Sequence, residues 1–386
     1  MDKENLTPEE IELQKQLQKE VAQIQADAPK ATESEKKEHR HHSHNHHSKK
    51  KSHKKLPMWA KIVITVVAIC VLLVGLAYGY VQITLDKIQK VDPVTVEKVD
   101  PAEETFETTE EINPELPVVN EEEVEWPEAD TNIMQDKDVV NILLVGQDKR
   151  SGESRQRSDT NIVVSINKKQ NAIKITSIMR DTYVQIPGYS DNRINAAYQF
   201  GGFELLDQTI EKNLGLHIDA NVEVDFDGFQ KIIDAIDGVD IDLNDTEVTY
   251  FNKNMNRSYT SGVNHMNGEE ALEYARCRSI GNSDWRRTER QRTVVMAAFN
   301  KMKGEGLTTL MGLADTLLPL ITTDMSNNEI LGYVYTVATM GAGEMESYRI
   351  PEEGAYSCVT LRKGMEVLMP DLDKNRAYLK QWIYGE

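Results

Sequence analysis

The stretch NILLVGQDKRSGESRQRSDTNIVVSINKKQNAIKITSI (residues 141–178) decides the fold class of this 386-residue chain. It holds three short, β-branched apolar runs, at residues 141–146, 160–166 and 172–178, and polar residues or glycine bound each run. Such runs are typical of strands, and the polar residues 167–171 form a tight turn between the last two. The stretch therefore predicts the first three strands of a sheet.

Helical and strand patterns alternate after this stretch. Residues 201–215 carry apolar side chains at helical spacing and end at a glycine, and residues 222–243 read strand, helix, strand. We therefore predict an α/β fold, with a single αβα domain at residues 139–386 in which helices flank a central mixed β-sheet. The later elements are helices expected at 269–275, 288–302, 307–320, 328–340 and 373–383 and a strand at 346–350.

Upstream of the sheet, residues 62–81 (IVITVVAICVLLVGLAYGYV) form a run of twenty residues without a charge. At about 1.5 Å of rise per residue, a helix of this length crosses a hydrocarbon core of about 30 Å. A cluster of lysines at positions 49–51, 54, 55 and 61 lies on its N-terminal side, which the positive-inside rule places in the cytoplasm. We predict a single-pass anchor in the cell membrane at residues 58–81, with the C-terminal domain extracytoplasmic. A cleaved signal peptide is disfavoured because the run is long and starts far from the N-terminus.

Two polar segments flank this anchor. Within residues 1–57, which contain few apolar residues, positions 36–55 carry eight Lys/Arg and seven of the nine histidines. This composition predicts a disordered, basic and histidine-rich cytoplasmic tail, and we assign no metal site to it. Residues 82–138 are predicted to be an extended acidic extracytoplasmic linker, because residues 91–130 contain fifteen Asp/Glu, one Lys and five prolines.

The net charge of −19 is concentrated in this linker, since residues 91–130 alone sum to −14. No basic face and no recognised DNA-binding motif offsets the acidic balance. Because binding to nucleic acid depends on neutralising phosphates with Lys and Arg, the sequence predicts no nucleic-acid partner.

Two aspartates flank the loop between the first two predicted strands. Asp148 directly follows the first run and Asp159 directly precedes the second, so both lie at one sheet edge if the strands pair as antiparallel neighbours. Carboxylates placed this close either share a proton or hold a cation. The alternative is that both aspartates only cap turns of the loop.

Arginines recur at strand ends and helix starts. Arg157 precedes Asp159 by two positions, so the two side chains leave one face of an extended segment, and Arg180 follows the third strand together with Asp181. Guanidinium groups bind phosphate oxygens in a forked geometry, whereas a solvated surface paired with acids is the alternative. Further arginines of this kind are Arg276 and Arg278 after a helix, and Arg287 and Arg290 on one helical face with Gln291.

The chain resembles the LytR-CpsA-Psr family of extracytoplasmic cell-wall glycopolymer transferases over residues 138–386. The resemblance rests on seven motifs in the family's order and at similar spacing. They are NILLVGQDKR (141–150), RSDTNIVVSIN (157–167), ITSIMRDTYVQIPG (175–188), RINAAYQFGG (193–202), VEVDFDGFQKIIDAIDGVDIDL (222–243), MNGEEALEYARCR (266–278) and RTERQR (287–292).

The resemblance also implies the site residues. It implies a magnesium (or manganese) ion held by Asp148 and Asp159. The candidate catalytic residues are Asp159, Arg180 and Asp181, with Asp181 supporting the neighbouring arginine. The family often reads Gly-Asp-Phe-Gly-Arg where this chain reads SDWRR (283–287), which leaves Arg286 as an alternative to Arg287 as the phosphate contact. The substrate-binding residues implied are Arg157, Arg276, Arg278, Arg287 and Gln291, with Arg180 among the pyrophosphate-binding arginines.

The activity implied is a phosphotransferase reaction at the membrane. An anionic glycopolymer, such as a teichoic acid or a capsule, passes from a polyprenyl-pyrophosphate carrier to peptidoglycan and forms a phosphodiester. The expected partners are therefore the lipid-linked polymer, peptidoglycan and membrane lipid. The alternatives are pyrophosphate hydrolysis of the same substrate and a membrane-bound regulator of envelope genes. A disulfide between Cys277 and Cys358 is also possible, but spacing alone does not establish its geometry.

Overall fold

The structure, a computed structural model, describes residues 72, 74–108, 113–127, 132–147, 149, 154–281, 283–304, 307–340 and 344–385. The chain divides into residues 1–65 and 66–386, and every described residue belongs to the second unit. The predicted tail and most of the predicted anchor lie outside the described residues, so both stay predictions. Within the described residues, no helix combines the length and the apolar character needed to cross a membrane.

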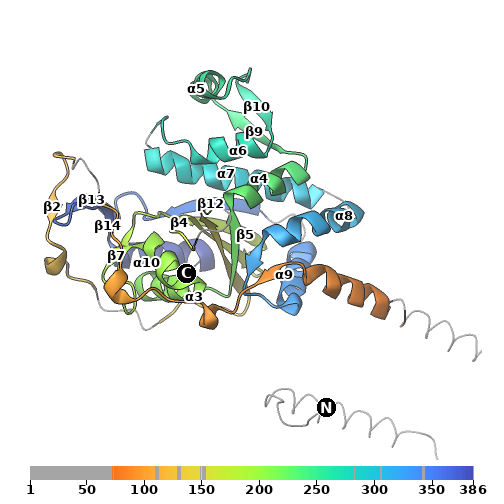
Figure 1. Cartoon of the computed structure of the whole chain (residues 1–386), viewed down its shortest axis with the longest axis horizontal. Coiled ribbons are helices and arrows are strands. Elements are labelled where there is room, and N and C mark those ends of the chain that lie inside the picture. Colours follow the sequence, from red (N-terminus) through yellow and green to blue (C-terminus); the bar gives the residue numbers. More distant parts are fainter. Residues whose placement is uncertain are drawn as a thin grey trace, which may run out of the picture. The chain divides into compact units, whose positions relative to one another are not determined.

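A seven-stranded mixed sheet forms the centre of the unit, in the order β1-β11-β8-β3-β4-β5-β12 (Figure 1). The pairs β3–β4 and β4–β5 are antiparallel, whereas β3–β8 and β5–β12 are parallel. This confirms the predicted mixed sheet and its first three strands. The strands are β1 Gln89–Lys90, β3 Val139–Gln147, β4 Ser158–Asn167, β5 Ala172–Ile178, β8 Ala220–Asp225, β11 Thr322–Thr323 and β12 Glu344–Ile350.

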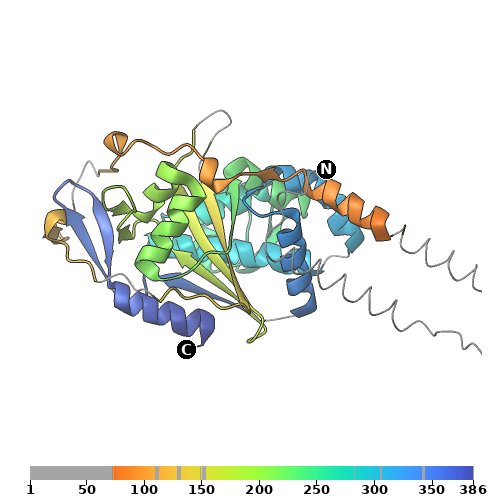
Figure 2. The same cartoon turned by 90° about the horizontal axis from the view of Figure 1, so that it is seen from below.

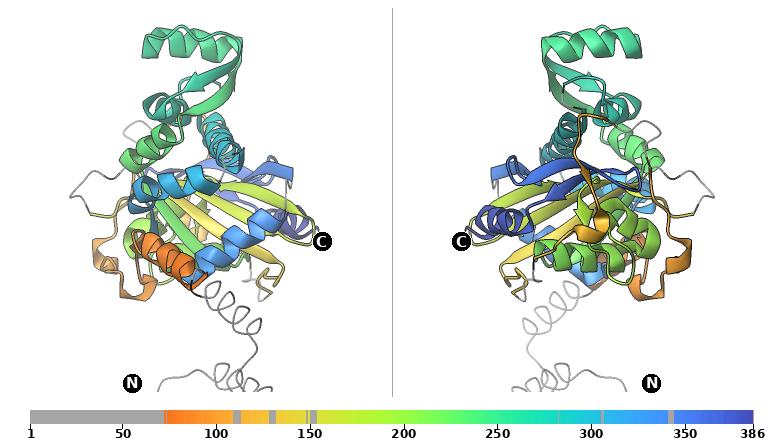
Figure 3. Two further views of the ribbon diagram at one scale, coloured as in Figure 1. Left: turned by 90° about the vertical axis from the view of Figure 1, so that its right-hand side faces the viewer. Right: turned by 90° about the vertical axis from the view of Figure 1, so that its left-hand side faces the viewer.

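Helices cover both faces of this sheet (Figure 2; Figure 3). Neighbouring residues of β4 point to opposite faces, so Val163 packs with helix α3 and Ile162 packs beside Val295 and Phe299 of helix α7. Burial of apolar side chains on both faces explains why the strands read as nearly continuous apolar runs. The covering helices are α3 Ile194–Leu214 and α10 Leu372–Leu379, which continues as a π-turn at Lys380–Tyr384, on one face, and α7 Ser283–Gly304 and α9 Asn327–Met340 on the other.

A second apolar cluster lies beside the central sheet, where a two-stranded antiparallel sheet packs with helices (Figure 1). Asn244 and Asn267 each accept a hydrogen bond from the backbone three residues on, and Glu247 and Glu270 return one, so two of its helices begin in capping boxes. The elements are α4 Phe226–Ala235, β9 Val239–Leu243, α5 Asp245–Met255, β10 Gly262–Met266, α6 Gly268–Arg276 and α8 Leu307–Leu317.

The acidic segment that the sequence suggested as an extended linker is in contact with the folded unit where the structure describes it. Strand β1 pairs with β11, β2 (Val118–Val119) pairs with β13 (Tyr356–Leu361), and the Val99 amide donates to the Phe200 carbonyl at 2.8 Å. The backbone groups of Gln89, Lys90, Val99, Val118 and Val119 make these contacts, which an average over composition does not reveal. The remaining elements are β6 Tyr183–Val184, β7 Asn192–Arg193 and β14 Glu366–Pro370, with short turns at Pro93–Thr95, Pro101–Glu103, Glu121–Glu123 and Leu318–Leu320.

The two described cysteines do not form a disulfide. Cys277 is buried at the end of α6, and Cys358 is exposed on β13, and both are free thiols. The possible pairing considered from the sequence is therefore not present in this structure.

Candidate functional site

A β-bulge places the first site residue at the edge of the sheet. Gly146 pairs with Thr160 and Gln147 pairs with Ser158, so Asp159 is the extra residue of the bulge. A Cβ at Gly146 would lie 3.0 Å from the Cβ of Thr160, so the close approach of these strands favours glycine. Bulges redirect a side chain, and here the carboxylate of Asp159 leaves the regular ladder.

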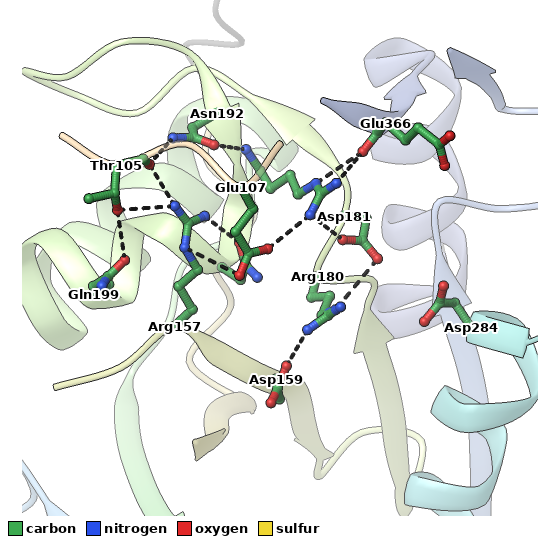
Figure 4. Close-up of polar contacts among 12 residues, drawn as sticks. Thr105, Glu107, Arg157, Asp159, Arg180, Asp181, Asn192, Gln199, Asp284 and Glu366 are labelled. Carbon is green, nitrogen blue, oxygen red and sulfur yellow. Dashed lines mark hydrogen bonds and ion pairs between the residues drawn. The ribbon is translucent and has the colours of Figure 1, made fainter. Parts of the chain in front are cut away.

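Arg180 follows β5 and meets this carboxylate (Figure 4). Its Nη1 lies 2.5 Å from Oδ1 of Asp159, and its Nε lies 3.6 Å from Oδ2 of Asp181. The structure therefore places Asp159, Arg180 and Asp181 together at the ends of β4 and β5.

Arg193, the residue before helix α3, extends the same group of charges. Its Nη1 lies 3.4 Å from Oδ1 of Asp181 and 2.9 Å from Oε2 of Glu107. Its Nε and Nη2 donate to the carbonyl of Glu366, at 3.0 and 2.6 Å. The contacts fix the plane of a buried guanidinium beside the strand ends.

Arg157 joins the group from the other side of Glu107. Its Nε lies 3.7 Å from Oε1 of Glu107, and its Nη2 donates to the Thr105 carbonyl at 2.6 Å. Its Nη1 donates to Oδ1 of Asn195 at 3.3 Å. One partly exposed carboxylate thus holds two arginines. We name Arg157, Arg180, Arg193, Glu107, Asp159 and Asp181 the arginine–carboxylate cluster.

The charges in the arginine–carboxylate cluster balance, with three guanidinium groups against three carboxylates. Burial lowers the pKa of Arg157. Burial also acts to lower the pKa of Arg180, but the charges of Asp181 and Asp159 outweigh it, so that this pKa is raised. Both arginines are therefore cations at neutral pH, and an entering anion has to compete with the carboxylates that already hold them.

Asp284, in the first turn of α7, forms a second group of charges next to the cluster. Its Oδ1 lies 3.2 Å from Nη1 of Arg287 and 3.6 Å from Nε of Arg278. Burial raises the pKa of Asp284, and the charge of Asp181 raises it further. Figure 4 shows the Asp284 carboxylate on the side of α7 that faces Arg180 and Asp181. The two groups therefore share one electrostatic environment.

The structure distinguishes Arg287 from its neighbour Arg286. The Arg287 side chain is 4% exposed and faces Asp284, whereas Arg286 is 57% exposed and pairs with Glu289 at 2.7 Å. Gln291 lies half-buried one turn further along α7. The alternative of a solvated arginine paired with an acid thus describes Arg286, whereas Arg287 is buried beside Asp284.

The other arginines of the prediction lie apart from the cluster or hold the fold. Arg276 stacks over the ring of Phe226, 4.7 Å from its centre, and lines with Arg278 a cavity of about 640 Å³. Arg290 is buried and donates from Nε to Oε1 of Glu247 at 3.0 Å, which ties α7 to α5. We therefore assign Arg290 to the packing of these helices.

The predicted metal site is described only in part. Asp148 lies outside the described residues, and Asp159 is paired with Arg180. Across the described ranges, no group of three or more His, Cys, Asp or Glu side chains is arranged to hold a metal ion. The described residues do not supply a ligand set by themselves, and the metal stays a prediction.

Sequence reasoning missed three members of the site. Glu107 and Thr105 lie in the acidic segment, which has no periodic pattern to mark two residues as different from the rest. Arg193 belongs to a quoted motif, and its position just before a helix start was the available signal.

The fold and the site define an α/β domain that carries buried, charge-paired arginines at the edge of its central sheet. The chain belongs to the LytR_cpsA_psr family, which matches residues 96–381. The match begins within the acidic segment, in agreement with the contacts that residues 99–107 make.

Known relatives cover most of this unit. "Regulatory protein MsrR" of Staphylococcus aureus (strain COL) is 32% identical over 250 residues, 63% of this chain and 74% of the relative. "Polyisoprenyl-teichoic acid--peptidoglycan teichoic acid transferase TagU" of Bacillus mycoides (strain KBAB4) is 39% identical over 180 residues, 46% of this chain and 57% of the relative.

Solved structures share the fold. The structure described as "TagT bound to LI-WTA" has a TM-score of 0.53 and 25% identity, covering 67% of this chain and 97% of that one. B. subtilis TagV has a TM-score of 0.52 and 28% identity, covering 64% of this chain and 98% of that one.

Proposed function

We propose that this protein transfers an anionic glycopolymer from a polyprenyl-pyrophosphate carrier to peptidoglycan, forming a phosphodiester. The observation that carries the proposal is the convergence of Arg157, Arg180 and Arg193 on three carboxylates at one sheet edge. Buried guanidinium groups bind the oxygens of a pyrophosphate in a forked geometry, and phosphoryl transfer depends mainly on such positioning and charge neutralisation.

The relatives support the choice of substrates. The TagU relative is named as a teichoic acid transferase from a polyisoprenyl carrier to peptidoglycan. The likeness to the TagT structure bound to LI-WTA points in the same direction. The proposal includes the membrane anchor at residues 58–81 and an extracytoplasmic location, which a membrane-borne carrier and a wall acceptor require.

The proposed reaction starts with a hydroxyl of the wall glycan. Its oxygen attacks the phosphorus on the polymer side of the pyrophosphate, a new P–O bond forms, and the bond to the polyprenyl phosphate breaks. The hydroxyl proton passes to a carboxylate, for which Asp159 is the described candidate, and the polyprenyl phosphate leaves as an anion. Arg180 neutralises the charge on the phosphate oxygens, while Asp181 positions Arg180 and Arg193.

A divalent cation at Asp148 and Asp159 is part of the proposal. When bound, magnesium or manganese would neutralise charge on the pyrophosphate oxygens. Its contribution is tested separately from that of the arginines, by comparing transfer in EDTA with transfer after addition of each metal.

The test is an in vitro assay with the full-length chain in detergent, a lipid-pyrophosphate glycan and peptidoglycan fragments. We expect Arg180→Ala and Asp159→Ala to reduce the wall-linked product strongly, and Arg286→Ala to serve as the matched control. If Arg180→Ala and Asp159→Ala both transferred the polymer at the wild-type rate, the assignment of this site would be wrong.

The same experiments distinguish transfer from two alternative functions. Hydrolysis of the same substrate yields free phosphorylated polymer and no wall-linked product. The name of the MsrR relative favours a regulatory role as a second candidate. Deletion of residues 1–50 separates it, because a transferase keeps its in vitro activity without the tail, whereas a signalling device that works through the tail loses its output.

A further inference from the structure

A cavity of about 360 Å³ opens between α7 and β12, outside the arginine–carboxylate cluster. Trp285, Arg286, Glu289 and Arg292 recur at the spacing of one helical face. None of these residues belongs to the pyrophosphate site predicted from the sequence, apart from Arg286, the alternative to Arg287. The opposite wall is made of Ser347, Tyr348, Arg349 and Glu352.

Arg292 is the unusual residue of this cavity. It is 8% exposed, and its Nε and Nη1 are buried without a hydrogen-bond partner in the part of the chain that the structure describes. The buried Nε of Arg349 lacks a hydrogen-bond partner in the same described part. A buried charged donor without an acceptor is costly, so native proteins rarely keep one unless a ligand or ion completes it.

The other charges of the cavity are already engaged. Glu289 pairs with Arg286 at 2.7 Å. The Tyr348 hydroxyl donates to Glu352, and this bond adds to the effect of burial, which is the larger cause of the raised Tyr348 pKa. Among the described residues, neither Arg292 nor Arg349 forms an ion pair with an acid of its own. Burial is the main cause that lowers the pKa of Arg292 to about 10; the charge of Glu289 opposes this shift and Arg349 adds to it, so Arg292 is still charged at neutral pH.

We propose that this cavity binds a phosphate group through Arg292 and Arg349. The two guanidiniums approach from different elements, α7 and β12, so the ligand needs acceptor oxygens on more than one side. A tetrahedral phosphate has them, whereas a carboxylate has two oxygens in one plane. The Ser347 hydroxyl, on the same wall, is a further donor.

The position of the cavity relates it to the first site. Asp284 belongs to the group beside the arginine–carboxylate cluster, and the next residue, Trp285, lines the cavity. The guanidinium of Arg349 lies over the Trp285 ring, 5.0 Å from its centre. If the proposed function holds, a polymer with phosphates in successive repeats would place one phosphate in the arginine–carboxylate cluster and another in this cavity.

The test is a titration of the full-length chain in detergent with inorganic phosphate, followed by NMR of arginine labelled with ¹⁵N. Arg292→Lys assigns the Arg292 Nε signal by its loss. We expect that signal to shift with phosphate in the wild type, and Arg349→Met to weaken the affinity reported by it about tenfold, or ~1.4 kcal/mol. Arg362→Met, at an exposed arginine directly after β13 that does not line this cavity, is the control and should change the affinity less than about twofold.

Three outcomes would overturn the inference. The first is an Arg292 signal that does not shift at phosphate concentrations that saturate the arginine–carboxylate cluster. The second is an Arg349→Met variant with wild-type affinity for phosphate. The third is tighter binding of acetate than of phosphate. If Arg292→Lys does not fold, the Arg349 Nε signal, which Arg349→Met assigns by its loss, reports phosphate binding in the wild type, and the absence of a phosphate-dependent shift of that signal overturns the inference. Arg180→Ala separates the two proposals: it should abolish transfer yet leave the Arg292 shift in place.

Discussion

The guanidinium of Arg180 lies 2.5 Å from the carboxylate of Asp159, and this contact joins the end of β5 to the bulge that opens β4. Both side chains are largely shielded from solvent, at 17% and 28% exposure. A pair in such a place interacts more strongly than one at the surface, because solvent screens it less. The contact fixes the orientation of the two side chains relative to each other.

Arg180→Lys keeps the charge of this pair but removes the forked donor. We expect kcat for transfer to fall roughly 100-fold, as happens when one preorganised donor to a developing negative charge is lost. The measurement is wall-linked product formed per unit time, with thermal unfolding of both proteins as the check on folding. Equal rates would mean that Arg180 acts only as a point charge.

Glu107→Gln removes the carboxylate that competes with substrate for Arg157 and Arg193. Glu107 is 44% exposed, so the ion pairs are screened and each is worth about 0.2–1 kcal/mol. We therefore expect the lipid-pyrophosphate substrate to bind roughly 2- to 5-fold more tightly, measured as a lower KM. Glu103→Gln, in the same acidic segment, is the control. A higher KM in Glu107→Gln would show instead that Glu107 positions the arginines.

Arg287→Met and Arg286→Met form a matched pair on adjacent positions of α7. The first removes the buried partner of Asp284, whereas the second removes an exposed partner of Glu289. We expect Arg287→Met to lower kcat/KM at least tenfold, about 1.4 kcal/mol, and Arg286→Met to stay near wild type. The reverse order would return the phosphate contact to Arg286.

Arg290→Met tests the structural role of the third arginine of this helix. Its removal leaves Glu247, which is 11% exposed, as a buried charge without this partner. We expect the free energy of unfolding to fall by about 3–5 kcal/mol, measured by urea denaturation. A loss of transfer with unchanged stability would place Arg290 in the site instead.

Asp207 should make stability depend on pH. Burial raises its pKa well above the ordinary value of 3.8, although a hydrogen bond from Asn221 opposes the shift. The folded state therefore binds the Asp207 proton more tightly than the unfolded state does. The stability that this bound proton contributes is lost as the pH rises from the ordinary pKa of Asp207 to its raised pKa.

The variant Asp207→Asn should accordingly gain stability relative to wild type as the pH rises, by about 1.4 kcal/mol for each unit of the shift. Urea unfolding at several pH values measures this difference. Asp237→Asn, at a side chain that is 98% exposed, is the control. A pH-independent difference for Asp207→Asn would contradict the assignment.

The sequence predicted the part of the site that local pattern and sheet geometry control. Asp159 and Arg180 stand at the ends of neighbouring apolar runs, and antiparallel pairing brings such ends together whatever the rest of the chain does. The same reasoning identified the mixed sheet and the helices on its faces, because their periodicity is strong.

The part that was not predicted depends on contacts between distant segments. Glu107 pairs with Arg193, and the two residues lie so far apart along the chain that no periodic pattern predicts their contact. Strand β2, which pairs with β13, consists of only Val118 and Val119. A run of two residues is too short to be predicted as a strand from the sequence. Burial of Arg290 against Glu247 likewise follows from how α5 and α7 meet.

The contacts of Thr105 and Glu107 have a practical consequence for anyone who shortens this protein. A fragment that starts at residue 139, where the sheet begins in the sequence, keeps every predicted site residue but deprives Arg157 and Arg193 of acceptors from the upstream segment. It would also lack the edge strand β1 beside β11. Such a fragment would be a poor substitute for the protein, and its inactivity would say nothing about the chemistry of the arginines that it retains.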